Sequence, residues 1–279
     1  MRARRILKIV AGVLVAGAAA FFAIGLHNAR ADPVVRQAYV AMPDWPKGAK
    51  PVRVALISDI HIGSWAMDAG RLTRIIGEVD ALKPDLVVIA GDLINGNDPH
   101  HGRRQMQDLV APLSRLHPPL GSFATIGNHD MWTGPGPIAA PLRQAGVTLL
   151  HNSAVSRGPL AIGGMDYTPY GATDLDTTMA KLRKLPGARL LITHTPEISN
   201  KVPGDVSLML AGHTHCGQAV FPVIGVAYII LQYGDRYLCG LKHVDGRTVV
   251  ITAGLGTSVV PLRFGAPPDL WLLTLGPQR

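Results

Sequence analysis

Short runs of apolar, often β-branched residues recur along the chain after residue 50, and each run ends in polar residues or glycine. Runs of this length and composition predict buried β-strands. Residues 69–84 instead carry apolar side chains at helical spacing and stop at Pro84, and residues 102–119 form a second helical pattern that Pro112 shortens or kinks. Helices between strands predict an α/β layered sheet, whose sites lie beyond the carboxyl ends of its strands.

The first 31 residues follow a different pattern. The basic run MRARRILK precedes an uncharged apolar segment, Ile9 to Leu26, that would span about 27 Å as a helix. We interpret residues 1–31 as a hydrophobic helix that anchors the chain in the inner membrane. The alternative is a cleaved export signal, because Ala29-Arg30-Ala31 offers a small-x-small cleavage site and Arg4-Arg5 resembles a twin-arginine signal. In both cases the basic end stays in the cytoplasm, which places the body on the periplasmic side.

Residues 32–50 contain three prolines and no sustained period, which predicts a linker with one short strand before a folded domain over residues 51–279. The formal net charge of +8 comes largely from the basic end. Five of the 27 basic residues precede the first acidic residue, Asp32, and the rest of the chain carries 22 basic and 19 acidic residues. Nucleic acid is therefore not an expected partner.

The chain has two cysteines, Cys216 and Cys239, which are too few for a disulfide framework. One disulfide in an oxidising compartment and two separate, partly buried thiols are both compatible with the sequence.

Polar side chains with metal-binding atoms stand at the ends of five apolar runs. They are Asp59 and His61 in VRVALISDIH, Asp92 in DLVVIAGDLING, Asn128 in GSFATIGNHD, His194 in RLLITHTPE, and His213 and His215 in VSLMLAGHTH. Each taken singly is more typical of a cap or a surface residue, but five strand ends together favour a metal site. Seven ligands exceed what one zinc takes, whereas two ions about 3.5 to 4 Å apart that share one carboxylate account for all seven.

The ordered blocks D-x-H, G-D, G-N-H-D, H and G-H-x-H, from Asp59 to His215, resemble the calcineurin-like metallophosphoesterase superfamily. The resemblance implies a four-layer α/β/β/α sandwich with a site for two divalent ions, which are Mn, Fe or Zn. It implies that Asp59, His61, Asp92 and His215 hold one ion, and that Asp92, Asn128, His194 and His213 hold the other, with Asp92 as the bridge. His129 would be the catalytic residue and not a ligand.

The chain is also similar to the membrane-tethered YaeI/YkuE-like phosphoesterases, through its hydrophobic segment, GHTHxGQ, and the closing stretch GLGTSVVPLRFGAPPDLWLLTL. Cys216 departs from that pattern, in which glycine is expected. Asn95 stands where the phosphoprotein phosphatases carry an aspartate that orients the catalytic histidine, and their arginine is absent, which argues against a protein phosphatase. Asp130 is a candidate partner of His129.

The expected activity is the hydrolysis of a phosphodiester or pyrophosphate bond in a membrane-associated substrate, with His129 donating a proton to the leaving oxygen. One alternative is the UDP-2,3-diacylglucosamine pyrophosphatase reaction of lipid A synthesis, whose substrate is made on the cytoplasmic leaflet, opposite to the expected position of the body. A metal-binding module without turnover is the alternative from another class. Asp166 and Arg263 are expected in the core or in salt bridges, with the rim of the site as the alternative.

Overall fold

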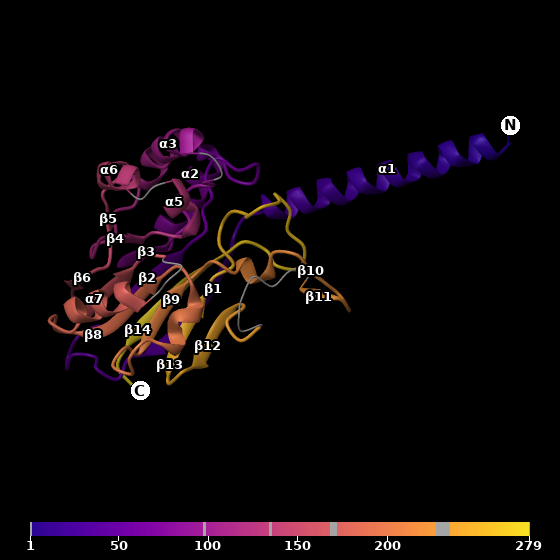
Figure 1. The fold of residues 1–279 in the computed structure, drawn as a ribbon. Helices are drawn as coiled ribbons and strands as arrows, with labels where there is room; N and C mark the ends of the chain where they lie inside the picture. Colours follow the sequence, from indigo (N-terminus) through magenta and orange to yellow (C-terminus); the bar gives the residue numbers. More distant parts are fainter. Residues whose placement is uncertain (1, 97–98, 134–135, 168–171, 227–234, 279) are drawn as a thin grey trace.

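Two six-stranded sheets pack face to face, and helices cover their outer faces (Figure 1). The computed structural model describes residues 2–278 apart from 97–98, 134–135, 168–171 and 227–234. This arrangement confirms the predicted four-layer α/β/β/α fold with an N-terminal hydrophobic helix. The helices are α1 (Arg2–Ala29), α2 (Ala69–Ala81), α3 (Pro99–Asp108), α4 (Val110–Leu113), α5 (Asn128–Thr133), α6 (Gly136–Gln144) and α7 (Ala172–Leu182), with 3-10 turns η1 (Pro196–Asn200) and η2 (His215–Gly217).

The two sheets have similar central strands. The first has the order β1 (Val34–Ala41), β14 (Asp269–Gly276), β2 (Val52–Ile57), β3 (Leu86–Ala90), β4 (Ser122–Thr125) and β5 (Val147–Leu149). The second has the order β12 (Gly240–Val244), β13 (Arg247–Ile251), β9 (Leu208–Ala211), β8 (Ala188–Thr193), β7 (Leu160–Met165) and β6 (Ser153–Arg157). Strands β2 to β5 run parallel, as do β7, β8, β9 and β13, so their carboxyl ends lie along common edges. A small hairpin, β10 (Val220–Phe221) and β11 (Gly225–Val226), stands apart from both sheets.

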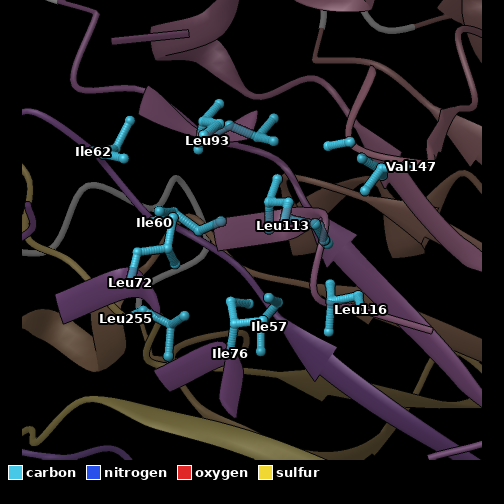
Figure 2. Packing of buried hydrophobic residues seen from close by; sticks show 14 of the residues in the cluster. Ile57, Ile60, Ile62, Leu72, Ile76, Leu93, Leu113, Leu116, Val147 and Leu255 are labelled. Atoms are coloured by element: carbon cyan, nitrogen blue, oxygen red, sulfur yellow. The ribbon is translucent and has the colours of Figure 1, made fainter. Parts of the chain in front are cut away.

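Alternation along the strands divides the core into layers. In β2, Val54 and Leu56 join the buried cluster between the two sheets. Ile57 faces the other way, into the cluster between the first sheet and its helices, where it packs near Ile76 of α2 (Figure 2). A third cluster fills the space between the second sheet, α7 and η1. Both faces of the central strands are therefore buried, which explains their nearly continuous apolar runs.

Both predicted helical segments form helices. Helix α2 begins after Asp68, whose carboxylate accepts a hydrogen bond from the Arg71 amide at 2.8 Å. The second segment is divided into α3 and α4 at Leu109. Pro112 lacks the N–H that would bond to the Asp108 carbonyl, so the helical ladder is interrupted there.

The segment interpreted as a linker contributes to the first sheet. Its one strand, β1, is eight residues long and pairs in parallel with β14 along its whole length. Met42 and Trp45 follow it into the cluster between the sheets. The pattern of this strand is weak because β1 lies at the sheet edge and keeps most of its side chains partly or fully exposed.

Helix α1 projects from the domain and is almost entirely exposed along its length (Figure 1). Among the described helices it alone is long and apolar enough to cross a membrane. Its last turns contact the domain: the Phe21 ring stacks on Phe264 with centroids 4.4 Å apart, and the Gly25 carbonyl accepts a hydrogen bond from the Arg263 amide at 3.0 Å. The base of the helix is therefore fixed against the folded body.

Candidate metal centre

The fold brings all seven predicted ligands together. Asp59, His61, Asp92 and Asn128 follow strands β2, β3 and β4 of the first sheet, and His194, His213 and His215 follow β8 and β9 of the second. His213 is half-buried and the other six are buried. The site thus forms where the carboxyl ends of the parallel strands of both sheets meet, as expected for α/β proteins.

One group of donor atoms surrounds His61. Its Nε2 lies 3.2 Å from His215 Nε2 and 3.5 Å from Asp92 Oδ2, and His215 Nε2 lies 3.3 Å from Asp59 Oδ1. Two ligand atoms that each sit about 2.1 Å from one ion are roughly 3 to 3.5 Å apart. These donor atoms have the spacing that one cation requires.

A second group surrounds His194. Its Nε2 lies 3.2 Å from Asp92 Oδ2, 3.1 Å from Asn128 Oδ1 and 3.2 Å from His213 Nδ1. The Nδ1 of His194 donates to the Ala90 carbonyl at 2.8 Å, which leaves Nε2 as the atom that faces the group. Because Asp92 Oδ2 belongs to both groups, the buried His and Asp side chains are suited to a dinuclear metal site.

The backbone is held in an unfavourable conformation at most of these positions. Five of the seven residues have φ between 47° and 72°, in the left-handed region that side chains other than glycine rarely adopt: Asp59, His61, Asp92, His213 and His215. Such conformations persist only where the surrounding structure enforces them, and they concentrate at functional sites.

Two glycines provide space for the carboxylates. A Cβ at Gly127 would overlap the Asp92 carboxylate, and a Cβ at Gly212 would overlap that of Asp59. The carboxylates are also oriented by main-chain donors: the His129 amide bonds to Asp92 Oδ1 at 2.9 Å, and the His213 amide lies 3.1 Å from both oxygens of Asp59. The remaining oxygen of Asp92, Oδ2, is directed toward the two histidine groups.

Burial keeps three of the imidazoles neutral. It lowers the pKa of His61 and His213 to about 3 and holds that of His215 well below its usual value. The neutral ring is the form of histidine that binds a cation.

The two buried carboxylates of the site have pKa shifts in opposite directions. Burial raises the pKa of Asp59 to about 6. Burial also disfavours charge on Asp92 and on His194, but the attraction between them prevails: it lowers the pKa of Asp92 and raises that of His194 to about 9. The Asp92 carboxylate is thus stabilised by positive charge beside it, which a bound cation also supplies.

His129 lies beside the metal-binding groups. Its Nδ1 lies 2.6 Å from the Asn95 carbonyl, to which it donates, and its Nε2 lies 3.2 Å from Ser258 Oγ. Its ring is 4.6 Å from that of His61, centroid to centroid. The histidine is thus oriented by the main-chain carbonyl of Asn95, at the position where protein phosphatases carry an aspartate side chain.

The sequence left more than one role open for Asp130, Asp166 and Arg263, and the structure places all three in the network that supports the site. Asp130 does not contact the His129 ring; its carboxylate accepts from the amides of Leu93 and Gly127 at 2.9 Å, and so fixes the loop that carries Asp92. Asp166 is buried and bonds to the Ile126 amide at 3.2 Å.

Arg263 is fully buried, and burial lowers its pKa to about 10. Its guanidinium donates to the carbonyls of Ala253, Gly256 and Ala266 at 2.6 to 2.9 Å and lies 3.4 Å from His215 Nδ1. It therefore belongs to the core, where it also supports the ring of a candidate ligand.

Cys216 and Cys239 form a disulfide next to His215. Cys216 has φ 53°, so the position where glycine was expected does take a left-handed backbone. The hydroxyl of Thr214 adds a hydrogen bond to the Leu238 carbonyl at 2.6 Å. Together these links tie the GHTHC loop to the segment before β12.

Two residues of the site escaped the sequence analysis. Ser258, beside His129, lies in a loop without a distinctive pattern. Gln218, the last residue of GHTHxGQ, donates to the Ser258 and Val260 carbonyls at 3.0 and 2.9 Å and accepts from the Ser258 amide at 2.9 Å. The position of Gln218 in the GHTHxGQ motif was the one sequence signal that it has a role in the site, which is to hold the loop that carries Ser258.

Comparison with known proteins agrees with this geometry. A model of the calcineurin-like phosphoesterase family matches residues 52–217. An uncharacterized metallophosphoesterase of Aquifex aeolicus is 30% identical and aligns over 82% of this chain and 87% of its own. The Bacillus subtilis metallophosphoesterase YkuE is 29% identical, over 82% of this chain and 81% of its own. A Danio rerio transmembrane protein with metallophosphoesterase domain is 29% identical over 90% of this chain, which spans 59% of that protein's length.

The fold and the clustered donor atoms are those of a metallophosphoesterase, an enzyme class that hydrolyses phosphoesters. The chain belongs to the calcineurin-like phosphoesterase family. The apolar α1 and the relative named as a transmembrane protein also point to membrane association.

Proposed function

We propose that this protein uses two divalent cations to hydrolyse a phosphodiester or pyrophosphate bond in a membrane-associated substrate. The observation that carries the proposal is the position of Asp92, whose Oδ2 lies 3.5 Å from His61 Nε2 and 3.2 Å from His194 Nε2. A carboxylate shared by two groups of donor atoms is the arrangement that a pair of ions needs.

The proposed ligands are those implied by the motifs. Asp59, His61, Asp92 and His215 would hold one ion, and Asp92, Asn128, His194 and His213 the other. When bound, the two cations supply neutralisation of the phosphoryl oxygens and greater acidity of the attacking water. Nitrogen and oxygen donors of this kind suit Mn, Fe or Zn.

His129 is proposed as the proton donor to the leaving oxygen. The Nδ1–H of His129 donates to the Asn95 carbonyl, with nitrogen and oxygen 2.6 Å apart. Nε2 is therefore the ring nitrogen able to exchange a proton with substrate. The Ser258 hydroxyl, 3.2 Å from Nε2, holds the ring in this orientation. A site that only stored metal would have no use for an imidazole positioned in this way.

A cavity beside the site supports a substrate that approaches from the membrane. It has a volume of about 400 Å³ and is lined by Phe22 of α1, Trp65, Val259 and Asn95, among others. Its lining includes both Phe22 of the anchor helix and Asn95, whose carbonyl holds His129. A lining of apolar side chains next to polar ones suits a phosphoester with an apolar tail.

The Cys216–Cys239 disulfide supports a body outside the cytoplasm, since structural disulfides persist in oxidising compartments. The basic run before Ile9 favours the same orientation. Both favour a substrate on the outer face of the inner membrane over the UDP-linked lipid made on the cytoplasmic leaflet.

The test is an assay of the full chain, in detergent, with bis-p-nitrophenyl phosphate, p-nitrophenyl phosphate and UDP-2,3-diacylglucosamine in parallel. We expect a diester or pyrophosphate to be cleaved faster than the monoester when Mn²⁺ is added, and a chelator to stop the reaction. Faster cleavage of the monoester would contradict the bond type. Absence of turnover with every divalent ion would favour the metal-binding module.

A further inference from the structure

Exposed apolar side chains gather around the base of α1. They are Trp65 (69% exposed), Val223 (106%), Ile224 (77%), Val259 (90%) and Val260 (48%). They come from three segments far apart in the sequence: the loop after β2, the β10–β11 hairpin and the loop after β13. Figure 1 shows the hairpin on the same side of the domain as the base of α1. A monomeric domain in water rarely collects so many large apolar side chains in one place.

The stretches of these three loops that carry the exposed apolar side chains contain no charged residue. Residues 62–67 read IGSWAM, residues 219–226 read AVFPVIGV, and residues 257–262 read TSVVPL, without one acidic or basic residue. Charged residues make up 16% of the whole chain. Loops exposed to water are normally polar, whereas a surface in contact with lipid excludes charge.

The contacts with α1 place the loops at the depth of the apolar segment. Phe21 lies 4.4 Å from Phe264 and 6.3 Å from Phe221, and Phe22 lies 6.1 Å from Trp65, all between ring centroids. Phe21 is five residues before Leu26, the end of the apolar segment, which corresponds to about 7.5 Å along the helix axis. With residues 9–26 in the hydrocarbon, the rings of the domain that contact Phe21 and Phe22 lie below the membrane surface.

The loop tips carry a second unusual feature. Val223 and Val259 have φ of 73° and 61°, and both are exposed. A β-branched residue in the left-handed region is a clear outlier, and here it turns an apolar side chain outward instead of into the protein.

We propose that these three loops insert into the bilayer beside α1 and form a second membrane contact, made by the catalytic domain itself. A lipid surface is the occupant that fits, because the patch is continuous with a membrane-spanning helix and lies at the same depth. The cavity lined by Phe22, Trp65 and Val259 then opens at the level of the lipid headgroups. This contact does not depend on the reaction that the site catalyses.

The first test uses tryptophan fluorescence of the full chain reconstituted in phosphatidylcholine and phosphatidylglycerol vesicles, with bromine atoms near the headgroup end of the acyl chains. The four tryptophans include two buried ones, Trp45 and Trp271, and two exposed ones, Trp65 and Trp132. We expect Trp65→Phe to remove most of the quenchable emission. The matched control Trp132→Phe, which removes an indole 60% exposed beside His129, should leave the quenching almost unchanged.

The second test moves the reporter to a loop tip. In the Trp65→Phe background, Ile224→Trp should restore quenching by the brominated lipids. Lys184→Trp, at an exposed position before β8 and thus at the end of the sheet opposite the site, should not. Circular dichroism checks that each variant is folded. An unquenched indole at position 224 would place the hairpin outside the bilayer and overturn the proposal, whatever the activity of the enzyme.

Discussion

The two sheets contribute different chemistry to one site. The first sheet supplies both carboxylates and the amide, together with one imidazole, whereas the second supplies imidazoles alone: Asp59, Asp92, Asn128 and His61 against His194, His213 and His215. The negative charge that would balance two cations therefore comes from one sheet. Each group of donor atoms nevertheless includes members from both sheets, so the site exists only when the sheets are packed against each other.

Because both carboxylates come from the first sheet, the negative charge of the site is concentrated there. Two buried carboxylates from neighbouring strands disfavour each other's charge, and the pKa of Asp59 is raised to about 6, chiefly by burial. The facing imidazoles are mostly neutral and relieve this only near His194. Bound cations would offset the repulsion between the Asp59 and Asp92 carboxylates. We therefore expect metal binding and sheet packing to stabilise one another.

The largest expected effect comes from the carboxylate that both groups share. Asp92→Ala should lose both metals, and turnover should fall to the level of chelator-treated protein, because neither group keeps its bridge. The matched change Asp59→Ala removes a carboxylate from one group only and should leave about one metal per chain. Metal analysis of the two purified variants decides this, and equal metal content in both would contradict the bridging role of Asp92.

A smaller effect is expected for the first-sheet residue that is proposed not to bind metal. His129→Ala leaves all seven ligands in place, so it should keep close to two metals per chain while turnover falls about 10²- to 10⁴-fold. The loss should be smallest for substrates whose leaving group is already a weak base. The His129 ring lies close enough to His61 and Asp92 to bind a metal with them. The metal content of the His129→Ala variant therefore decides between the two roles. Loss of metal would make His129 a ligand, and full retained activity would remove it from the mechanism.

The smallest effect is expected from Ser258, in the loop after β13. Ser258→Ala deletes the hydroxyl 3.2 Å from His129 Nε2, a hydrogen bond worth about 0.5 to 1.5 kcal/mol, which corresponds to a roughly 2- to 10-fold fall in turnover. Ser258→Thr keeps the hydroxyl and should retain most of the activity. Steady-state rates on one diester suffice, and equal losses in both variants would assign the effect to loop packing.

Much of the site was predictable because its ligands follow strands. An apolar run that ends in a polar residue fixes both the strand and the edge at which that residue lies, as for Asp92 and His194. The role of Asp130 was not predictable, since it bonds to backbone amides that a sequence does not locate. The same holds for the Asn95 carbonyl. Ser258 meets His129 across 129 residues of chain, and no local pattern signals such a contact.

The fold shows the same division. Strands buried on both faces are evident from their continuous apolar runs, whereas residues 32–50 predict only a linker with one short strand, because an exposed edge strand such as β1 lacks a continuous apolar run. The choice between a disulfide and two thiols for Cys216 and Cys239 depended on their separation in space, which is 4.9 Å between Cα atoms.

The pairing of β1 with β14 decides how far the enzyme can travel. Helix α1 ends at Ala29 and β1 begins at Val34, so only four residues connect the two, with a reach of about 14 Å when fully extended. With α1 retained in a bilayer, the domain cannot swing out on a flexible leash to sample the surrounding solution. For the membrane-associated substrate proposed above, encounters with the site would then be a two-dimensional search, and the lateral diffusion of that substrate in the bilayer would set its rate of supply.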